Sequence, residues 1–330
     1  MLALKDFSEN DMESIMNTTI TVVGAGGLGS PALRLLTAIG FGKIRIIDRD
    51  IVELSNIQRQ TIYNTQDIGE PKVEAASTNL KMVNPNVEFD PLCVSIREEN
   101  AQDLLRGTDI ILDGLDSFKA RRAVNRASQE LKVPYIFAGA VEYYANLSTF
   151  VPGKTGCLNC VMGDAEDNPE NTCARVGVTP TLLSIAAAVE VNEAVRLAMG
   201  REPVLGNRLM TIDSESLTFD FFDIGKSEEC PICSKSGQSF EPKKNELTVT
   251  HLCSQSYNIS PPKIEKLNLN ELAEKLNQSY SVKPIGKSIL VTLTTGEKIT
   301  LMISGSAIIK GVDTADEAIR LYELILKKAT

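Results

Sequence analysis

Two cations and two amides lie close together between Asn56 and Lys72, and their side chains suit the binding of a polyphosphate. Arg59 offers a planar fork of donors for bidentate phosphate contact, and Lys72 is a compact point charge. Asn56 and Gln58 can add neutral donors. Cleavage of a nucleoside triphosphate to release pyrophosphate builds negative charge on the β- and γ-phosphates, which such cations stabilise. Hydride transfer from a bound diphosphate has little use for both cations, so the segment favours triphosphate chemistry.

A glycine-rich turn precedes these cations, between a short apolar run and the start of a helix. The β-branched run 19–23 leads into the turn, and Ser30 and Pro31 follow it, with the proline suited to a first helical turn. Glycines let the backbone approach a phosphate closely, and the free N–H groups of a helix N-terminus bind it. The glycines that the pattern assigns to nucleotide binding are Gly24, Gly26, Gly27 and Gly29.

Carboxylates follow two further apolar runs. The run 43–47 delivers Asp48, which can accept hydrogen bonds from ribose hydroxyls. The run 109–113 leads to Asp116 at the same edge of an open α/β sheet, and its carboxylate is the natural Mg²⁺ ligand.

The glycine turn and Asp48 alone would also permit an NAD-dependent oxidoreductase. That alternative is disfavoured by the two downstream cations and by the cysteines.

Four of the seven cysteines form two CxxC pairs. The pairs are Cys157 with Cys160 and Cys230 with Cys233. Two such pairs in one chain predict a tetrahedral zinc site built of four thiolates. Because protein ligands fill all four positions, the zinc would be structural and would clip the two segments together. The alternative of redox pairs or free thiols lacks a thioredoxin-like context.

The three remaining cysteines and the one histidine lie outside these pairs. Cys173 follows the polar stretch 163–171 and is either a nucleophile that captures an activated acyl group or persulfide sulfur, or a loop cysteine without a chemical role. Cys93 and Cys253 are predicted to be small hydrophobic residues in or near strands. A Ser-His-Asp or Cys-His hydrolase would have to depend on His251, which we expect to be a surface or strand residue without a catalytic part.

The elements that must position these residues alternate between strand and helix. The strand-like runs are 19–23, 43–47, 87–94, 109–113 and 134–138. With helical stretches between them, they predict an α/β fold with a Rossmann-like, mostly parallel sheet and helices on both faces. The apolar stretch 181–199 carries several charged residues and is predicted to be a buried helix rather than a membrane span.

A polar stretch, 234–245, follows the second cysteine pair directly and is the best linker candidate. It predicts a larger domain of residues 1–240 and a small α+β C-terminal domain of residues 241–330. The elements expected in the small domain are a strand at 247–252, a helix at 270–277, strands across 280–310 and an amphipathic helix at 314–328.

Composition excludes several classes of partner. The 330 residues carry a formal net charge of −9, which argues against a nucleic-acid-binding surface. The first residues lack the basic and apolar regions of a secretion signal, and no apolar run is long enough to span a membrane. We therefore expect a soluble cytoplasmic protein that binds neither nucleic acid nor membrane.

Taken together, these residues resemble the MoeB/ThiF family of ubiquitin-activating-enzyme-like adenylyltransferases. The match is dense from about residue 19 to residue 240, and its most specific element is NIQRQ at 56–60 with Lys72 downstream. The resemblance implies a homodimer that uses ATP and Mg²⁺ to adenylate the C-terminal glycine of a ubiquitin-like sulfur carrier ending in Gly-Gly, with release of pyrophosphate. It places Cys173 near the carrier's C-terminus. The residues that it implies for ATP·Mg²⁺ are Gly26, Asp48, Asp50, Asn56, Arg59, Lys72 and Asp116.

The chain departs from the family pattern at its N-terminus. Family members carry an arginine there that reaches the partner subunit's ATP, but the first 33 residues contain none, which leaves Lys5 or Arg34 as substitutes. The departure keeps a third hypothesis open, a non-catalytic scaffold that binds the carrier. No cysteine follows Cys253, so the tail is not a rhodanese-like sulfurtransferase, and sulfur must come from a separate desulfurase or rhodanese. Molybdopterin synthesis, thiamin synthesis and tRNA thiolation all remain open as pathways.

Overall fold

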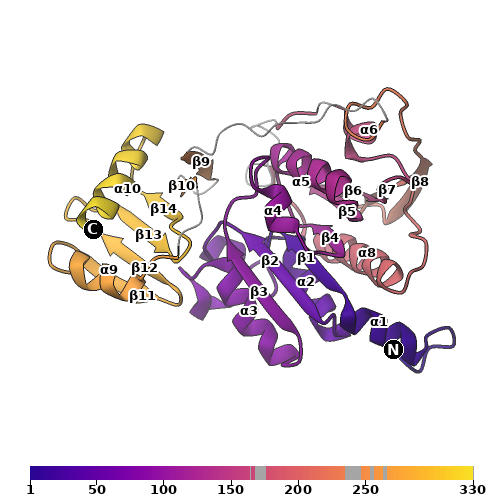
Figure 1. Ribbon diagram of the computed structural model, residues 1–330, viewed down its shortest axis with the longest axis horizontal. Coiled ribbons are helices and arrows are strands. Elements are labelled where there is room, and N and C mark those ends of the chain that lie inside the picture. The colour runs from indigo at the N-terminus through magenta and orange to yellow at the C-terminus, as the bar shows by residue number, and fades with distance from the viewer. Residues whose placement is uncertain (164, 168–175, 235–246, 253–255, 263–265, 330) are drawn as a thin grey trace.

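A computed structural model describes residues 1–330 apart from 164, 168–175, 235–246, 253–255, 263–265 and 330. The described residues form two sheets, an eight-stranded sheet within residues 19–223 and a six-stranded sheet within residues 248–310. Figure 1 shows the smaller sheet and its helices beside the β3 end of the larger one. Among the described residues, no helix combines the length and apolar character that a membrane crossing requires.

The large sheet is parallel in its first half and antiparallel in its second. In spatial order, its strands are β3 (Glu88–Cys93), β2 (Lys43–Asp48), β1 (Thr19–Val23), β4 (Ile110–Asp113), β5 (Tyr135–Val141), β6 (Tyr144–Phe150), β7 (Arg208–Asp213) and β8 (Thr218–Asp223). Neighbours from β3 to β5 are parallel, and those from β5 to β8 are antiparallel. The order reverses between β1 and β4, which is where open α/β sheets bind ligands. The predicted Rossmann-like sheet is confirmed.

Helices cover both faces of this sheet. One face packs against α2 (Gly29–Ile39), α3 (Lys72–Val83) and α8 (Pro180–Ala198). The other face packs against α4 (Ala101–Leu105) and α5 (Phe118–Leu131). The N-terminal helix α1 (Glu9–Asn17) begins at a capping box formed by Ser8 and Asp11 and contacts α8. The predicted buried helix at 181–199 corresponds to α8.

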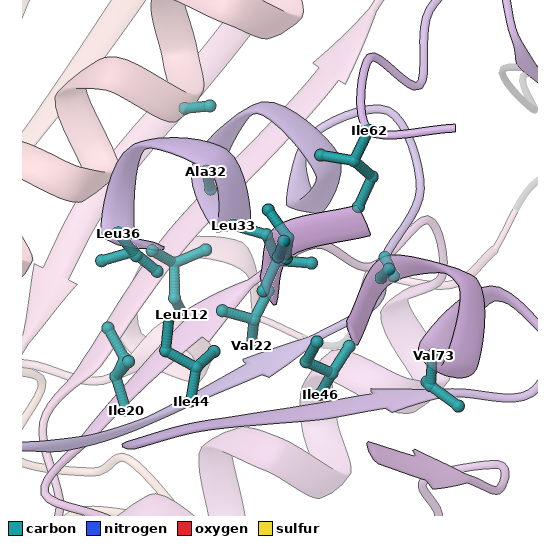
Figure 2. Packing of buried hydrophobic residues seen from close by; sticks show 14 of the residues in the cluster. Ile20, Val22, Ala32, Leu33, Leu36, Ile44, Ile46, Ile62, Val73 and Leu112 are labelled. Carbon is teal, nitrogen blue, oxygen red and sulfur yellow. The ribbon is translucent and has the colours of Figure 1, made fainter. Parts of the chain in front are cut away.

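Alternating side chains of β1 and β2 build the core beneath α2. Figure 2 shows Ile20 and Val22 beside Ile44 and Ile46, with Leu33 of α2 packed onto them. All five are fully buried, and burial of each such side chain contributes about 1.5–3 kcal/mol. β-Branched side chains alternate inward along both strands. The two strands pair in parallel and in register, so their carboxyl ends meet at one edge of the sheet.

Beyond β5 the chain forms strands that the sequence indicated only in part. The stretch 147–151 has strand character in the sequence and overlaps β6, whereas β7 and β8 have no counterpart among the predicted runs. The short helix α6 (Leu158–Met162) begins directly after Cys157.

The C-terminal residues form the predicted small α+β domain. Its antiparallel sheet contains, in spatial order, β11 (Ser281–Ile285), β12 (Ser288–Thr292), β13 (Lys298–Met302), β14 (Ala307–Lys310), β10 (Ser256–Ser260) and β9 (Thr248–Leu252). Two helices pack on one face of this sheet, α9 (Leu269–Leu276) and α10 (Ala315–Ala329). The domain boundary near 240 lies outside the described residues and stays a prediction.

The other face of the small sheet packs on the large domain. Met302 and Ile308 belong to the same buried cluster as the residues under α2, and Met302 contacts Cys93 of β3. Ser95 Oγ donates to Asn258 Oδ1 at 3.1 Å across the same contact. Cys93 is therefore a buried strand residue, as predicted. The sequence did not predict this extensive contact, because it joins residues more than 150 positions apart.

Candidate active site

The glycines of the turn after β1 have different tasks. A Cβ on Gly24 would lie 2.3 Å from Gly114 O, and one on Gly29 would lie 1.8 Å from Gly24 O. A residue with a side chain would clash at either position, so both must be glycine. A Cβ on Gly27 would meet Leu183 of α8 at 2.7 Å. Gly26 differs, because a Cβ there would meet only Gln60 Nε2, at 3.9 Å. Of the four predicted glycines, Gly26 is the one that leaves open space for a ligand against the backbone.

Asp48, at the end of β2, connects the glycine turn to the segment that follows it. Its Oδ2 accepts from Ala25 N at 2.7 Å, and its Oδ1 accepts from Asp50 N at 2.7 Å. Burial raises the pKa of Asp48. Each carboxylate oxygen has a second lone pair, so Asp48 keeps the capacity to accept from a ribose hydroxyl, and its role there stays a prediction.

Lys72 and Asp50 form an ion pair at the centre of the site. Lys72 Nζ lies 3.3 Å from Asp50 Oδ2, and the lysine side chain is 7% exposed. The Lys72 backbone N–H also donates to Asp50 O at 2.9 Å, which holds the two chain segments together. Burial opposes the charged lysine, but Asp50 and Asp48 outweigh it and raise the pKa of Lys72. Lys72 therefore stays a cation inside the site.

Two buried oxygens, one on Asp50 and one on the Gln60 side chain near Gly26, have no hydrogen-bond partner among the described residues. They are Asp50 Oδ1 and Gln60 Oε1. An unsatisfied buried polar group costs about 1–3 kcal/mol, which a ligand or its metal ion can offset. Gln60 was not among the predicted site residues, although it ends the NIQRQ motif that could have indicated it. These atoms and the open side of Gly26 fit a nucleotide with Mg²⁺.

The other residues of the motif lie in a short 3-10 turn, η1 (Leu54–Asn56), and just after it. Asn56 is buried, and its Oδ1 accepts from Glu53 N at 3.1 Å, which fixes the turn. Arg59 Nη1 donates to Ser55 O at 2.9 Å, and among the described residues no carboxylate forms an ion pair with this guanidinium. Gln58 is exposed. Arg59 is thus free of acidic partners and available to a phosphate.

Asp116 projects from a turn that a buried network fixes. Arg121 Nε lies 3.0 Å from Asp113 Oδ2, and Tyr135 donates to the same carboxylate. Arg121 Nη2 donates to Leu115 O at 2.6 Å, which anchors the turn between β4 and α5. Asp116 itself is exposed, and its charge helps raise the pKa of Lys72. The predicted magnesium ligand therefore acts on the same site as Lys72 and Asp50.

A second carboxyl lies buried behind this network. Glu190 of α8 is fully buried, and both of its oxygens lack a hydrogen-bond partner among the described residues. Burial, followed by the charge of Asp113, raises the pKa of Glu190 well above its ordinary value. The fold therefore favours the protonated form of Glu190.

The four predicted zinc ligands come together. Their sulfur atoms all lie within 4.8 Å of one another. Cys157 Sγ and Cys230 Sγ are 3.7 Å apart, and Cys160 Sγ and Cys233 Sγ are 3.4 Å apart. A tetrahedral site with Zn–S bonds of about 2.3 Å needs sulfur spacings of about 3.8 Å, so the cluster fits zinc. Asn125 Nδ2 donates to Cys157 Sγ at 3.6 Å, which supports the cluster from α5.

Five residues singled out in the sequence remain. Cys173 lies outside the described residues, as does Cys253. Lys5 and Arg34 are both exposed. His251 is an exposed residue of β9 and contacts Tyr257 edge to face, consistent with a strand residue that has no catalytic part.

The open α/β sheet, its glycine turn and the cation between two carboxylates define a nucleotide-binding enzyme. The ThiF family model matches residues 1–232, and the chain belongs to the ThiF family. The resemblance noted from the motifs is thereby confirmed. Adenylyltransferases recur among its relatives, and the chain is an adenylyltransferase of this family.

Two relatives illustrate the similarity. The Sulfur carrier protein ThiS adenylyltransferase of Bacillus subtilis is 30% identical over 313 residues, which cover 91% of this chain and 90% of that protein. The SAMP-activating enzyme E1 of Haloferax volcanii is 30% identical over 68% of this chain and 83% of its own length. The similarity to the Bacillus protein thus extends into the C-terminal domain.

Solved structures show the same fold. Escherichia coli MccB matches with a TM-score of 0.62 and 24% sequence identity over 71% of this chain and 69% of that chain. At this identity the likeness concerns the fold alone.

Proposed function

We propose that this chain adenylates the C-terminal glycine of a ubiquitin-like sulfur carrier that ends in Gly-Gly. The observation that carries the proposal is the juxtaposition of a buried cation, Lys72, with Asp50, Asp116 and the open backbone at Gly26. The names of the relatives support the choice of substrate, because several are adenylyltransferases of sulfur carrier proteins or of molybdopterin synthase.

The reaction needs no general base. A carboxylate is ionised at neutral pH, so the carrier's terminal oxygen can attack the α-phosphorus of ATP directly. The new acyl–oxygen–phosphorus bond forms as the bond to the β-phosphate oxygen breaks, and pyrophosphate leaves. Lys72 and Arg59 stabilise the charge that develops on the leaving group. Asp116 and Asp50 would hold Mg²⁺, which neutralises phosphate charge when bound.

The remaining site residues hold the nucleotide in place. Asp48 orients the ribose, and the amides of Asn56 and Gln58 contribute neutral donors to the phosphates. The four cysteines would hold Zn²⁺ as a structural ion, remote from the transferred phosphate. Cys173 serves a later step, in which sulfur replaces the adenylate on the carrier.

We infer a cytoplasmic homodimer in which Lys5 or Arg34 of one subunit serves the role of the absent N-terminal arginine. The sulfur comes from a separate desulfurase or rhodanese. The carrier is of the ThiS or MoaD kind, and tRNA thiolation remains a third destination for the sulfur.

ATP–pyrophosphate exchange tests the proposal against its alternatives. The purified protein is incubated with ATP, Mg²⁺ and labelled pyrophosphate, alone and with ThiS-type and MoaD-type carriers. We expect exchange only with a carrier, and none with the same carrier lacking its last glycine. A scaffold gives no exchange with any carrier, and an oxidoreductase gives none but reduces NAD. Pull-down from the native cells with identification by mass spectrometry then names the carrier.

A further inference from the structure

Two lysines of the C-terminal domain form ion pairs with segments of the nucleotide site. Lys310 Nζ, at the end of β14, lies 2.5 Å from Glu53 Oε1. Lys287 Nζ, in the turn between β11 and β12, lies 2.9 Å from Glu74 Oε2 in the first turn of α3. Both lysines lie beyond residue 232, where the match to the ThiF family model ends. The domain therefore holds chain segments on both sides of Lys72.

The pair of Lys310 with Glu53 is the better shielded of the two. Its side chains are 36% and 22% exposed, whereas Lys287 is 63% exposed. Exposed ion pairs contribute little, because water screens the charges and two flexible side chains must be ordered. Because the ion pair of Lys310 with Glu53 is short and partly buried, it is the one of the two that can fix the position of the site loop.

Glu53 directly precedes the short turn η1, which leads to Asn56 and Arg59. The residue before it, Val52, donates its N–H to Glu70 O at 2.8 Å, which ties this segment to the one that carries Lys72. Glu53 O accepts from Asn56 N at 2.9 Å, and Glu53 N donates to Asn56 Oδ1 at 3.1 Å. Arg59 follows within one turn. Displacement of Glu53 must therefore displace Asn56 and Arg59.

The domain also acts on the carboxylate side of the site. Arg49 directly precedes Asp50, the acidic partner of Lys72. Asn258 Nδ2 of β10 donates to Arg49 O at 3.4 Å. Polar side chains of the small sheet thus contact the segment 49–53 at both of its ends.

We propose that the C-terminal domain completes the adenylation site, and that Lys310 is a positioning residue that holds Glu53 so that Asn56 and Arg59 face the phosphates. The inference rests on the proposed function and assigns a task to a part of the chain outside the matched family region. Lys310 acts through Glu53 and makes no contact with substrate itself.

Carrier adenylation by purified full-length variants tests this role. Lys310→Met and Glu53→Gln are each expected to lower kcat about 10-fold while the KM for the carrier stays unchanged. Each variant should lower the midpoint of thermal unfolding by no more than about 4 °C. The matched control is Lys298→Met, because Lys298 lies opposite Lys310 on the neighbouring strand β13 and is exposed. It should retain full activity.

The double variant and the charge swap separate positioning from loss of structure. Lys310→Met with Glu53→Gln should be no slower than either single variant, because both remove one interaction. Lys310→Arg, and Lys310→Glu combined with Glu53→Lys, should recover most of kcat. The inference is overturned if wild-type protein is active while both single variants retain full kcat, or if their losses multiply in the double variant. Wild-type protein without carrier-dependent exchange overturns the proposed function instead, and the inference with it.

Discussion

Replacement of Lys72 by methionine tests the core of the site, because the lysine cation lies between two carboxylates. The variant keeps the length of the side chain but leaves Asp50 and Asp48 without their common cation. Loss of one charge-stabilising donor at a developing oxyanion costs about 2.7–4 kcal/mol, so carrier adenylation should fall by about 10²–10³-fold. ATP binding, measured by calorimetry, should weaken much less, because the lost interaction is strongest when pyrophosphate departs.

Stability should change together with activity and with a defined pH dependence. The pKa of Asp50 is lowered from 3.8, so its contribution is present above pH 3.8 and is lost as pH falls through the folded pKa. The pKa of Lys72 is raised from 10.5, so its contribution is present below pH 10.5 and is lost as pH rises through the folded pKa. Lys72→Met should therefore be less stable than wild type between these limits, and the difference should shrink beyond them.

A second lysine provides the control for this experiment. Lys43 pairs with Glu88 at 2.5 Å on the same sheet, but the two side chains are 35% and 65% exposed. Lys43→Met should change the free energy of unfolding by about 0–1 kcal/mol and leave adenylation intact. Near-normal exchange in Lys72→Met would refute the assignment of Lys72 to the leaving pyrophosphate.

Four further substitutions test other parts of the structure. Asp116→Asn should shift the Mg²⁺ titration of exchange to higher concentration without unfolding the protein, and an unchanged midpoint would reassign Asp116. Cys157→Ser should lose both zinc and thermal stability, whereas a stable wild-type protein found free of zinc by metal analysis contradicts the site. Cys173→Ala should retain exchange but impair sulfur transfer to the carrier, and loss of exchange in a folded variant would place Cys173 in the first step. Glu190→Gln should be more stable than wild type above pH 4.5, the ordinary pKa, since only the unfolded glutamate releases its proton there. Denaturation at several pH values measures this, and a difference independent of pH would show that Glu190 is ionised in the fold.

Several site residues could be predicted because local pattern alone places them. Asp48 and Asp116 follow apolar β-branched runs, and parallel strands deliver their ends to one edge of a sheet. The CxxC spacing likewise brings two cysteines into reach of one ion, although only the fold joins the two pairs. Where the position of a side chain follows from local spacing, the sequence was sufficient to predict that position.

The missed features depend on long-range packing. The orphaned oxygen of Gln60 becomes visible only when the residue is buried beside Gly26. The ion pair between Glu53 and Lys310 joins positions 257 residues apart, and local sequence patterns cannot predict a contact over that separation. Similarly, the charges of α8 indicated that it does not cross a membrane, but not that Glu193 would turn inward to accept from Leu205 N at 2.9 Å.

The contact among Gly24, Gly29 and Gly114 limits how this site can diversify. A side chain at Gly114 would lie 2.2 Å from Gly24 O, so the turn that carries the phosphate loop and the turn that leads to Asp116 touch backbone to backbone. Neither turn can shift without moving the other, so the backbone proposed to hold the nucleotide and the turn proposed to present the Mg²⁺ ligand must move as one unit. Substitutions have room on the open side of Gly26, whereas a side chain at any of the three touching glycines would disturb both turns at once.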